Sequence, residues 1–149
     1  MYRGAVADYS GTPLTKKLGI AEGKRVALIG APEGFERTLA PLPGGVALAR
    51  GVPRAAVDVI VLFAKDAAEL ARSFAKAKAR LDPAGGLWVA WPKKASGVAT
   101  DLSEDLVREV GLAAGLVDNK VCAIDGTWSG LRLVVRIKDR PKKARSAKQ

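Results

Sequence analysis

Residues 57–64 read VDVIVLFA, an apolar run of the length expected for one buried β-strand. A helical pattern follows at residues 66–81, where apolar side chains recur at three- and four-residue spacing. Residues 82–86, DPAGG, are expected to break this helix and to lead into a second apolar run, LWVAW at residues 87–91. Two strands joined by one helix through short connections lie parallel in a sheet. This segment therefore predicts an α/β fold.

Two carboxylate pairs indicate where helices begin. Asp66 and Glu69 have the spacing of a capping box, in which each side chain satisfies a free backbone N–H group in the first turn. Asp101 and Glu104 repeat this spacing ahead of a second apolar helical pattern. We therefore expect a further helix over residues 101–114.

The chain before residue 57 predicts smaller elements. Thr12 is a suitable N-cap for a short helix over residues 13–18. The run KRVALIG at residues 24–30 is typical of a buried strand. A short helix up to about residue 39 and a short strand at residues 46–49 are expected to follow it.

The C-terminal part predicts a hairpin and a tail. Residues 119–124 and 131–137 have strand patterns and are separated by a short turn, which indicates two antiparallel strands. The expected fold is therefore a Rossmann-like, mostly parallel sheet flanked by helices and ending in an antiparallel β-hairpin. Residues 1–137 are predicted to form one domain with a loose start at residues 1–8, and residues 138–149 to form a disordered basic tail.

The composition limits the chemistry that the chain can perform. Among its 149 residues there is no histidine, which removes the usual general base near neutral pH and the commonest metal ligand. Cys122 is the only cysteine, so no intrachain disulfide can form and a reducing compartment, the cytoplasm, is expected. No signal-peptide pattern and no apolar run long enough to cross a membrane are visible. We identify no catalytic residue and no metal site.

The net charge of +10 is unevenly distributed along the chain. The predicted tail contributes half of it through six basic residues against Asp139: Lys138, Arg140, Lys142, Lys143, Arg145 and Lys148. Basic tails add salt-sensitive affinity for nucleic acid, and they also occur as solubilising extensions. Both interpretations remain open.

The order of elements over residues 24–137 resembles the second half of the class I methyltransferase fold. The resemblance implies that the loop after the first strand is glycine-rich and receives S-adenosylmethionine. It also implies that an acidic residue after the second strand binds the ribose hydroxyls. Here Ala31 adds a side chain to the loop, Pro32 removes a backbone donor, and Arg50 cannot accept a hydrogen bond. The chain therefore resembles a degenerate, truncated methyltransferase, whose cofactor is unknown and which is expected to bind none.

Four short strings resemble a narrower family. They are YSGTPL at residues 9–14, APEGF at 31–35, WVAWPKK at 88–94 and TWSGL at 127–131. The family comprises small uncharacterised bacterial proteins that share a domain of unknown function. It implies no activity that could be transferred to this chain.

Ligands of open α/β sheets bind outside the carboxyl ends of the parallel strands. Three loops leave these ends here, at residues 30–35, 64–66 and 91–97. The first loop offers backbone N–H groups to an anion, or is simply a tight turn. In the third loop an aromatic ring and two lysines could bind a base and its phosphate, or the ring could be core and the lysines solvated. The candidate ligand-binding residues are Gly30, Pro32, Glu33, Gly34, Phe35, Trp91, Lys93 and Lys94.

Trp128, in the predicted hairpin turn, is either exposed as a contact surface or folded back as a cap. Since no carboxylate pair has a spacing that suggests acid–base catalysis, we interpret the protein as a non-catalytic binding or regulatory module. The alternatives are a cryptic enzyme or cofactor binder that uses S-adenosylmethionine or a nucleotide, and an accessory protein that contacts nucleic acid through the tail. A protein partner or an anionic ligand is possible, and no membrane partner is expected.

Overall fold

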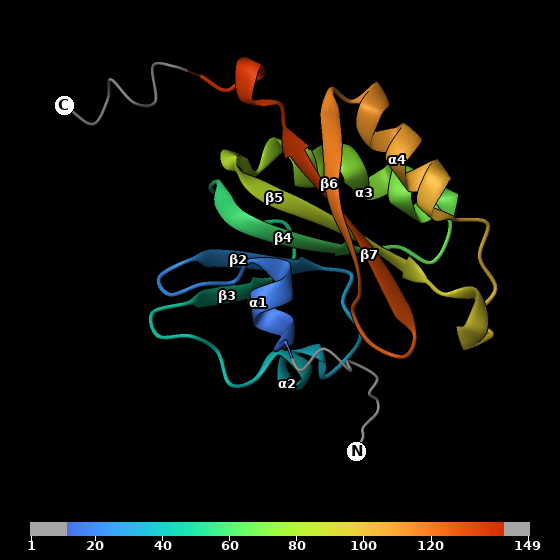
Figure 1. The fold of residues 1–149 in the computed structure, drawn as a ribbon, viewed down its shortest axis with the longest axis horizontal. Coiled ribbons are helices and arrows are strands. Elements are labelled where there is room, and N and C mark those ends of the chain that lie inside the picture. Colours follow the sequence, from blue (N-terminus) through green and yellow to red (C-terminus); the bar gives the residue numbers. More distant parts are fainter. Residues whose placement is uncertain (1–11, 142–149) are drawn as a thin grey trace.

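The computed structural model describes residues 12–141, in which six strands form one sheet with the order β3-β2-β4-β5-β7-β6 (Figure 1). The strands are β2 (Arg25–Ile29), β3 (Ala47–Arg50), β4 (Val57–Phe63), β5 (Leu81–Pro92), β6 (Leu116–Ala123) and β7 (Trp128–Val135). Neighbouring strands from β3 to β5 are parallel, whereas β7 is antiparallel to both β5 and β6. The predicted α/β class, with a mostly parallel sheet that ends in an antiparallel hairpin, is confirmed.

Helices cover both faces of the sheet (Figure 1). They are α1 (Leu14–Leu18), α2 (Phe35–Leu39), α3 (Ala67–Ala79) and α4 (Glu104–Ala113), with 3-10 turns η1 (Lys94–Ser96) and η2 (Ile137–Asp139). α1 and α2 pack on one face, and α3 and α4 pack on the other. The sheet is therefore a middle layer with one hydrophobic core on each side.

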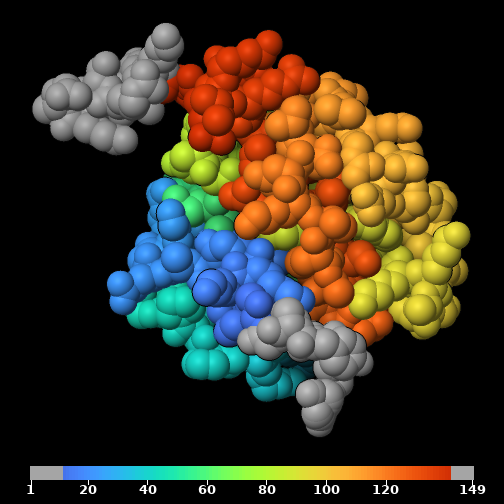
Figure 2. Space-filling view, viewed as in Figure 1, coloured from blue at the N-terminus to red at the C-terminus, as the bar shows by residue number. Residues whose placement is uncertain are grey.

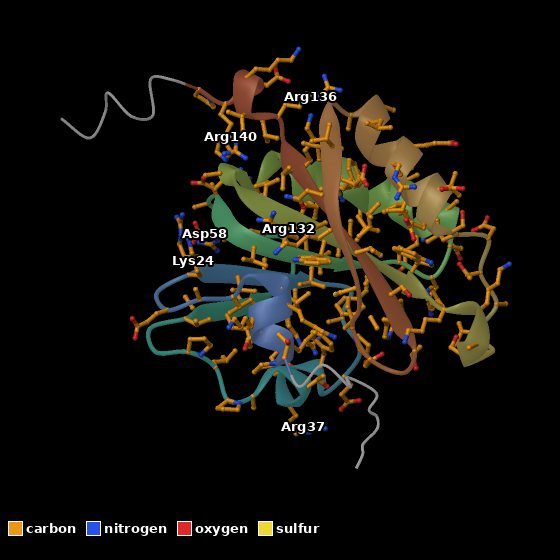
Figure 3. The ribbon with its side chains drawn as sticks, viewed as in Figure 1. Lys24, Arg37, Asp58, Arg132, Arg136 and Arg140 are labelled. Carbon is orange, nitrogen blue, oxygen red and sulfur yellow. The ribbon has the colours of Figure 1, made fainter. Side chains whose placement is uncertain are left out.

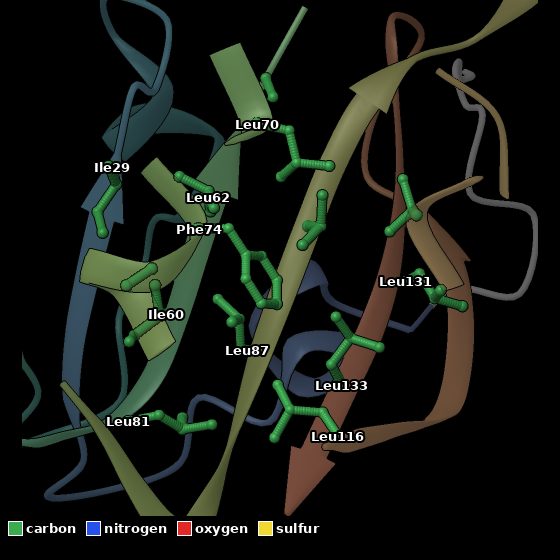
Figure 4. Packing of buried hydrophobic residues seen from close by; sticks show 14 of the residues in the cluster. Ile29, Ile60, Leu62, Leu70, Phe74, Leu81, Leu87, Leu116, Leu131 and Leu133 are labelled. Atoms are coloured by element: carbon green, nitrogen blue, oxygen red, sulfur yellow. The ribbon is translucent and has the colours of Figure 1, made fainter. Parts of the chain in front are cut away.

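The larger core lies between the sheet and α3 with α4 (Figure 4). Leu70 and Phe74, one helical turn apart on α3, pack against Ile60 of β4 and Leu87 of β5. Leu133 extends this core onto β7 and is completely buried. The strand predicted at residues 57–64 and the helix predicted after residue 66 therefore bury their apolar faces against each other.

The second core lies under α1 and α2 and is centred on Trp88, which is 0% exposed. Its indole Nε1 donates a hydrogen bond to the carbonyl of Leu18, at the end of α1, over 3.0 Å. On this side α1 and the β6–β7 hairpin lie side by side (Figure 2), and Lys17 Nζ donates to the carbonyl of Ala123 over 3.3 Å. Trp91 lies on the opposite face at 7% exposure, as expected for residues three apart on a strand.

The boundary between α3 and β5 differs from the prediction. Leu81 is not the last residue of the helix but the first of β5, where it pairs with Val57. Residues 82–86 belong to the strand as well, and the register between β4 and β5 shifts there. The helical spacing of Leu81 is misleading because its burial comes from β4, a partner that the local pattern does not contain.

Of the capping box predicted for α3, the N-cap residue Asp66 is confirmed. Asp66 accepts a hydrogen bond from the backbone N–H of Glu69 over 2.8 Å. The Glu69 carboxylate reaches back one residue further than a capping box requires, to the N–H of Lys65, also over 2.8 Å.

The predicted capping box of the next helix is wrong. Ser103 is the N-cap of α4 and accepts from the N–H of Leu106 over 3.2 Å. Asp101 instead accepts from the N–H of Ala67, the first residue of α3, over 2.8 Å. It therefore satisfies a free N–H of the other helix, which tertiary packing brings close to it.

The first helix also begins one residue later than predicted. Pro13, not Thr12, is the N-cap of α1, because its backbone is extended (ψ 146°) while its carbonyl already accepts from Lys16 and Lys17. Gly19 ends α1 in the left-handed conformation (φ 81°).

The hairpin strands are shifted toward the N-terminus relative to the prediction. β6 begins at Leu116 instead of residue 119, and β7 runs from Trp128 to Val135 instead of over residues 131–137. Ile137 is 80% exposed in η2 and is not part of the sheet. Cross-strand pairing sets these ends, since β6 and β7 pair from Leu116–Val135 to Ala123–Ser129.

The predicted tail begins within the described residues. Residues 138 and 139 belong to η2, and Arg140, which follows them, donates from its Nε to the carbonyl of Val135 over 3.2 Å. Residues 1–11, which include the predicted loose start, and residues 142–149 lie outside the described part. Within residues 12–141 no helix is long and apolar enough to cross a membrane.

Candidate functional site

The strand order reverses between β2 and β4, because β3 follows β2 on one side and β4 lies on the other. Such a switch point is where open α/β sheets bind ligands. A cavity of about 260 Å³ opens there, which we call the switch-point crevice. Its lining consists of Gly30, Pro32, Phe63, Lys65, Glu69 and Trp128.

The crevice begins at a glycine that no other residue can replace without strain. Gly30 follows β2 with φ +71°, in the left-handed region. A Cβ atom at this position would lie 2.9 Å from the carbonyl oxygen of Phe63. The close approach of these two segments therefore requires glycine.

Aromatic rings form one wall of the crevice. The Phe63 ring meets Phe35 at a centroid distance of 4.9 Å and Trp128 at 5.0 Å, both edge to face. Trp128 is the first residue of β7 and not a turn residue, and its ring packs back against Phe63, one of the two arrangements left open by the sequence. Asp125 Oδ1 holds the turn by accepting from the N–H groups of Thr127 and Trp128 over 2.8 and 2.9 Å.

Arg50, at the end of β3, bridges the loop after β2 to α2. Its Nη1 donates to the carbonyl of Ala31 over 2.9 Å, and its Nη2 donates to the carbonyl of Pro32 over 2.7 Å. The same guanidinium forms a two-pronged pair with the Glu36 carboxylate, at 2.6 Å from Nε and 2.9 Å from Nη2. We call these four hydrogen bonds the Arg50 clamp.

The clamp should be measurable through Glu36. The hydrogen bond from Arg50, followed by one from the backbone N–H of Glu36, lowers the pKa of this carboxyl from 4.5 to about 2. The pair contributes stability above pH 4.5 that is lost as the pH falls toward 2, a small contribution because both side chains are 41% exposed. In a ¹³C NMR titration we expect a Glu36 pKa near 2, and its return toward 4.5 in Arg50→Gln. An ordinary Glu36 pKa in the wild-type protein would show that the clamp does not form in solution.

The structure places the first group of predicted site residues around this clamp. Gly30 and Pro32 line the crevice, and Phe35 packs against its aromatic wall. Gly34 is the N-cap of α2 with φ +81°, and the charge of Glu33 helps to raise the pKa of Arg50 after the larger effects of Glu36. Two carbonyls of this loop face a guanidinium, so the loop presents acceptors where the sequence suggested donors for an anion.

The second group of predicted site residues, Trp91, Lys93 and Lys94, lies apart from the switch-point crevice. Trp91 is buried in the core under α3 and α4, which leaves little of its ring for stacking a base. Lys93 is half-buried and its N–H donates to the carbonyl of Thr127 over 2.8 Å, while Lys94 is exposed at the start of η1. None of these three residues lines the crevice.

Sequence reasoning missed most of the lining. Lys65 lay in one of the three loops expected to face a ligand, but was not selected from it. Phe63 and Glu69 were assigned only to the strand and to a helix cap. Trp128 could have been selected from its place in the predicted turn, whereas the contact of Arg50 with two carbonyls some twenty positions earlier had no local signal. No group of three or more potential metal-ligating side chains occurs within residues 12–141.

Two solved structures with a similar arrangement of strands and helices are described as methyl-transferring enzymes. A ribosomal protein L11 methylase from Lactobacillus delbrueckii subsp. bulgaricus matches with a TM-score of 0.58 and 12% identity, over 82% of this chain and 74% of that one. A SAM-dependent methyltransferase from Aquifex aeolicus matches with a TM-score of 0.55 and 15% identity, over 89% and 98%. At these identities the likeness concerns the fold alone, which is the methyltransferase-like Rossmann fold.

The family follows from the sequence comparison. A profile described as "Protein of unknown function (DUF3052)" matches residues 16–137, and the chain belongs to this family. Both predicted resemblances, to a domain of unknown function and to the class I methyltransferase fold, are therefore confirmed. A search of curated proteins found no match to the chain.

Proposed function

We propose that this protein is a non-catalytic binding module, in which a methyltransferase-like fold binds a small ligand at the switch-point crevice and transfers no methyl group. The Arg50 clamp is the observation that carries the proposal. A guanidinium has only donors, so it cannot accept hydrogen bonds from ribose hydroxyls where the methyltransferase resemblance implies a carboxylate. Its bonds to the carbonyls of Ala31 and Pro32 also fix the loop that, by the same resemblance, would receive the cofactor.

The size of the crevice supports the same conclusion. Its volume of about 260 Å³ is below the roughly 300–1,000 Å³ of ordinary small-molecule pockets. The Phe63–Trp128 pair fills space beside Gly30 and narrows the opening. A ligand for this crevice is therefore smaller than a complete S-adenosylmethionine molecule.

The lining suggests the chemistry of that ligand. Pro32 and Trp128 are half-buried and offer apolar surface above the buried Phe63, while Lys65 is exposed and supplies the positive charge. Glu69, the one carboxylate of the lining, already accepts from the N–H of Lys65. A small planar molecule with an anionic group matches this combination. A cytoplasmic location stays a prediction, based on the single cysteine.

Parallel NMR titrations with benzoate and with S-adenosylmethionine test the proposal. We expect benzoate to shift the backbone signals of Gly30 and Phe63 and the indole signal of Trp128, saturably. Lys65→Gln should weaken this binding about tenfold, as expected for loss of one charge-assisted contact. Lys94→Gln, the same change at an exposed lysine outside the crevice, is the matched control.

A Tm measurement with S-adenosylmethionine tests the alternative, that the protein binds this cofactor. A ligand at about a hundred times its Kd adds about 2.7 kcal/mol to stability, which raises the Tm of a domain of this size by several degrees. We expect no such increase at millimolar S-adenosylmethionine. A saturable increase, or benzoate shifts that are unchanged in Lys65→Gln, would overturn the proposal and favour a cofactor binder.

A further inference from the structure

A second feature lies at the opposite edge of the sheet, where the parallel strands begin, and it concerns Arg132 of β7. Burial, and then the charge of Arg140, lower the pKa of the Arg132 guanidinium. Within residues 12–141 the Arg132 side chain has neither an ion pair nor a hydrogen bond, whereas the guanidinium groups of Arg25, Arg50 and Arg108 are all paired with carboxylates. A half-buried cation without a partner is costly, and such groups are usually compensated.

The sheet is shaped to hold this side chain. Arg132 pairs with Trp88 across β5 and β7, so it lies on the face covered by α1. Its side chain crosses Gly86, where any Cβ atom would collide with the Arg132 Nε. The DPAGG segment, which the sequence presented as a helix breaker, therefore contributes the glycine over which the arginine passes.

The Arg132 side chain lines a small cavity of about 90 Å³. The other lining residues are Gly19, Lys24, Asp58, Val59, Ala84 and Gly85. The volume suits one tetrahedral oxyanion better than an organic molecule.

Further positive charge lies close to Arg132. Lys120 of β6 lies directly opposite Arg132, and the Arg140 charge is close enough to affect the Arg132 pKa. Figure 3 shows Lys24, Asp58, Arg132 and Arg140 in one region of the molecule, with Arg37 far away at α2.

Asp58, the one carboxylate of the lining, is already engaged. Burial raises its pKa, but hydrogen bonds and the charge of Arg25 lower it further, so the net shift is downward and Asp58 stays ionised. Arg25 contacts both carboxylate oxygens, over 2.8 and 3.2 Å to Oδ2 and 3.2 Å to Oδ1. Asp58 is thus neutralised by Arg25 and leaves Arg132 without a counter-charge.

We propose that Arg132, Arg140 and Lys24 form a binding site for a phosphate group at the amino-terminal edge of the parallel strands, distinct from the switch-point crevice. A phosphate oxyanion would supply the acceptors that Arg132 lacks, and Arg and Lys are the usual partners of phosphate. The group is either free phosphate or the phosphodiester of a nucleic acid.

The test uses the full chain and two probes, inorganic phosphate and a short single-stranded oligonucleotide. At constant ionic strength, balanced with chloride, we expect phosphate to shift the Arg132 Nε–H signal and the Gly85 and Gly86 amides saturably. Arg132→Gln should weaken phosphate binding about tenfold. Arg72→Gln, at an exposed residue of α3 on the other face, should leave it unchanged.

Folding is not expected to confuse this test. Arg132→Gln removes an uncompensated, half-buried charge, so its Tm should be equal to or higher than that of the wild-type protein. Arg140→Gln is the second variant, with the same expected direction for phosphate binding.

The oligonucleotide distinguishes the two sources of phosphate. Tighter binding than inorganic phosphate, with a salt dependence that becomes less steep in Arg132→Gln, assigns the site to a phosphodiester. Saturable phosphate binding without a gain for the oligonucleotide assigns it to free phosphate. Shifts that do not saturate, or that persist at equal strength in Arg132→Gln, would overturn the proposal.

Discussion

Trp88→Ala is expected to lower the free energy of unfolding by about 3–5 kcal/mol, the usual cost of removing a fully buried large aromatic residue. Trp88 is 0% exposed and joins the sheet to α1. The substitution would leave a cavity next to Leu18 and would deprive the buried Leu18 carbonyl of its donor. Urea unfolding followed by circular dichroism measures the change.

Trp88→Phe separates packing from hydrogen bonding at this position. Phenylalanine retains most of the ring but lacks the N–H that Leu18 accepts, so we expect an intermediate loss. Since typical hydrogen bonds contribute only about 0.5–1.5 kcal/mol, packing should account for most of the Trp88→Ala effect. A loss below about 1.5 kcal/mol in Trp88→Ala would contradict the role of this residue as the centre of the second core.

Phe63→Ala is expected to cost a similar amount, about 3–5 kcal/mol, and in addition to enlarge the switch-point crevice. Phe63 is 2% exposed and its ring lies between Phe35 and Trp128. Its removal leaves both neighbouring rings without their edge-to-face partner. Thermal and urea unfolding report the stability, and the Trp128 indole NMR signal reports the local change.

Two further variants identify the source of the Phe63 effect. Phe63→Leu keeps part of the apolar volume but loses the aromatic contacts, so it should cost less than Phe63→Ala. A double-mutant cycle with Trp128→Leu isolates the ring contact, for which we expect a coupling of about 0.5–1.5 kcal/mol. A coupling of zero would show that Trp128 does not fold back onto Phe63 in solution.

The two proposed sites occupy opposite edges of one sheet and differ in kind. The switch-point crevice lies where the fold class commonly places ligands; Phe63 and Trp128 line it, and the Arg50 clamp fixes the adjoining loop. The Arg132 cavity lies where the parallel strands begin, beside the hairpin. Because the two sets of residues do not overlap, failure of either binding test leaves the other proposal intact.

The sequence alone determined the class of fold. Apolar runs of strand length and the helical pattern after residue 66 are local signals, because each residue contributes to its own element through the periodicity of its neighbours. The same locality explains the confirmed opposite orientation of Trp88 and Trp91, and the confirmed N-cap Asp66, whose acceptor serves an N–H three residues away.

Tertiary structure decided the contacts between distant positions. Asp101 resembles the cap of its own helix, yet it satisfies an N–H of Ala67, 34 positions earlier. Leu81 fits a helical pattern, yet it pairs with Val57 in the sheet. In both cases the free energy gained with a distant partner outweighs the local preference, and no short window of sequence contains that partner.

Both proposed sites also depend on contacts between distant positions, which only the tertiary structure decides. Arg50 lies 19 and 18 positions from the two carbonyls that it contacts, and only the parallel pairing of β2 with β3 brings the three together. Arg132 lies across Gly86 because β7 pairs with β5. The sequence determines which chemical groups are available and which element carries each of them. The packing of the strands determines which groups meet, since hydrogen bonds and charges act over a few ångströms in space whatever the separation along the chain.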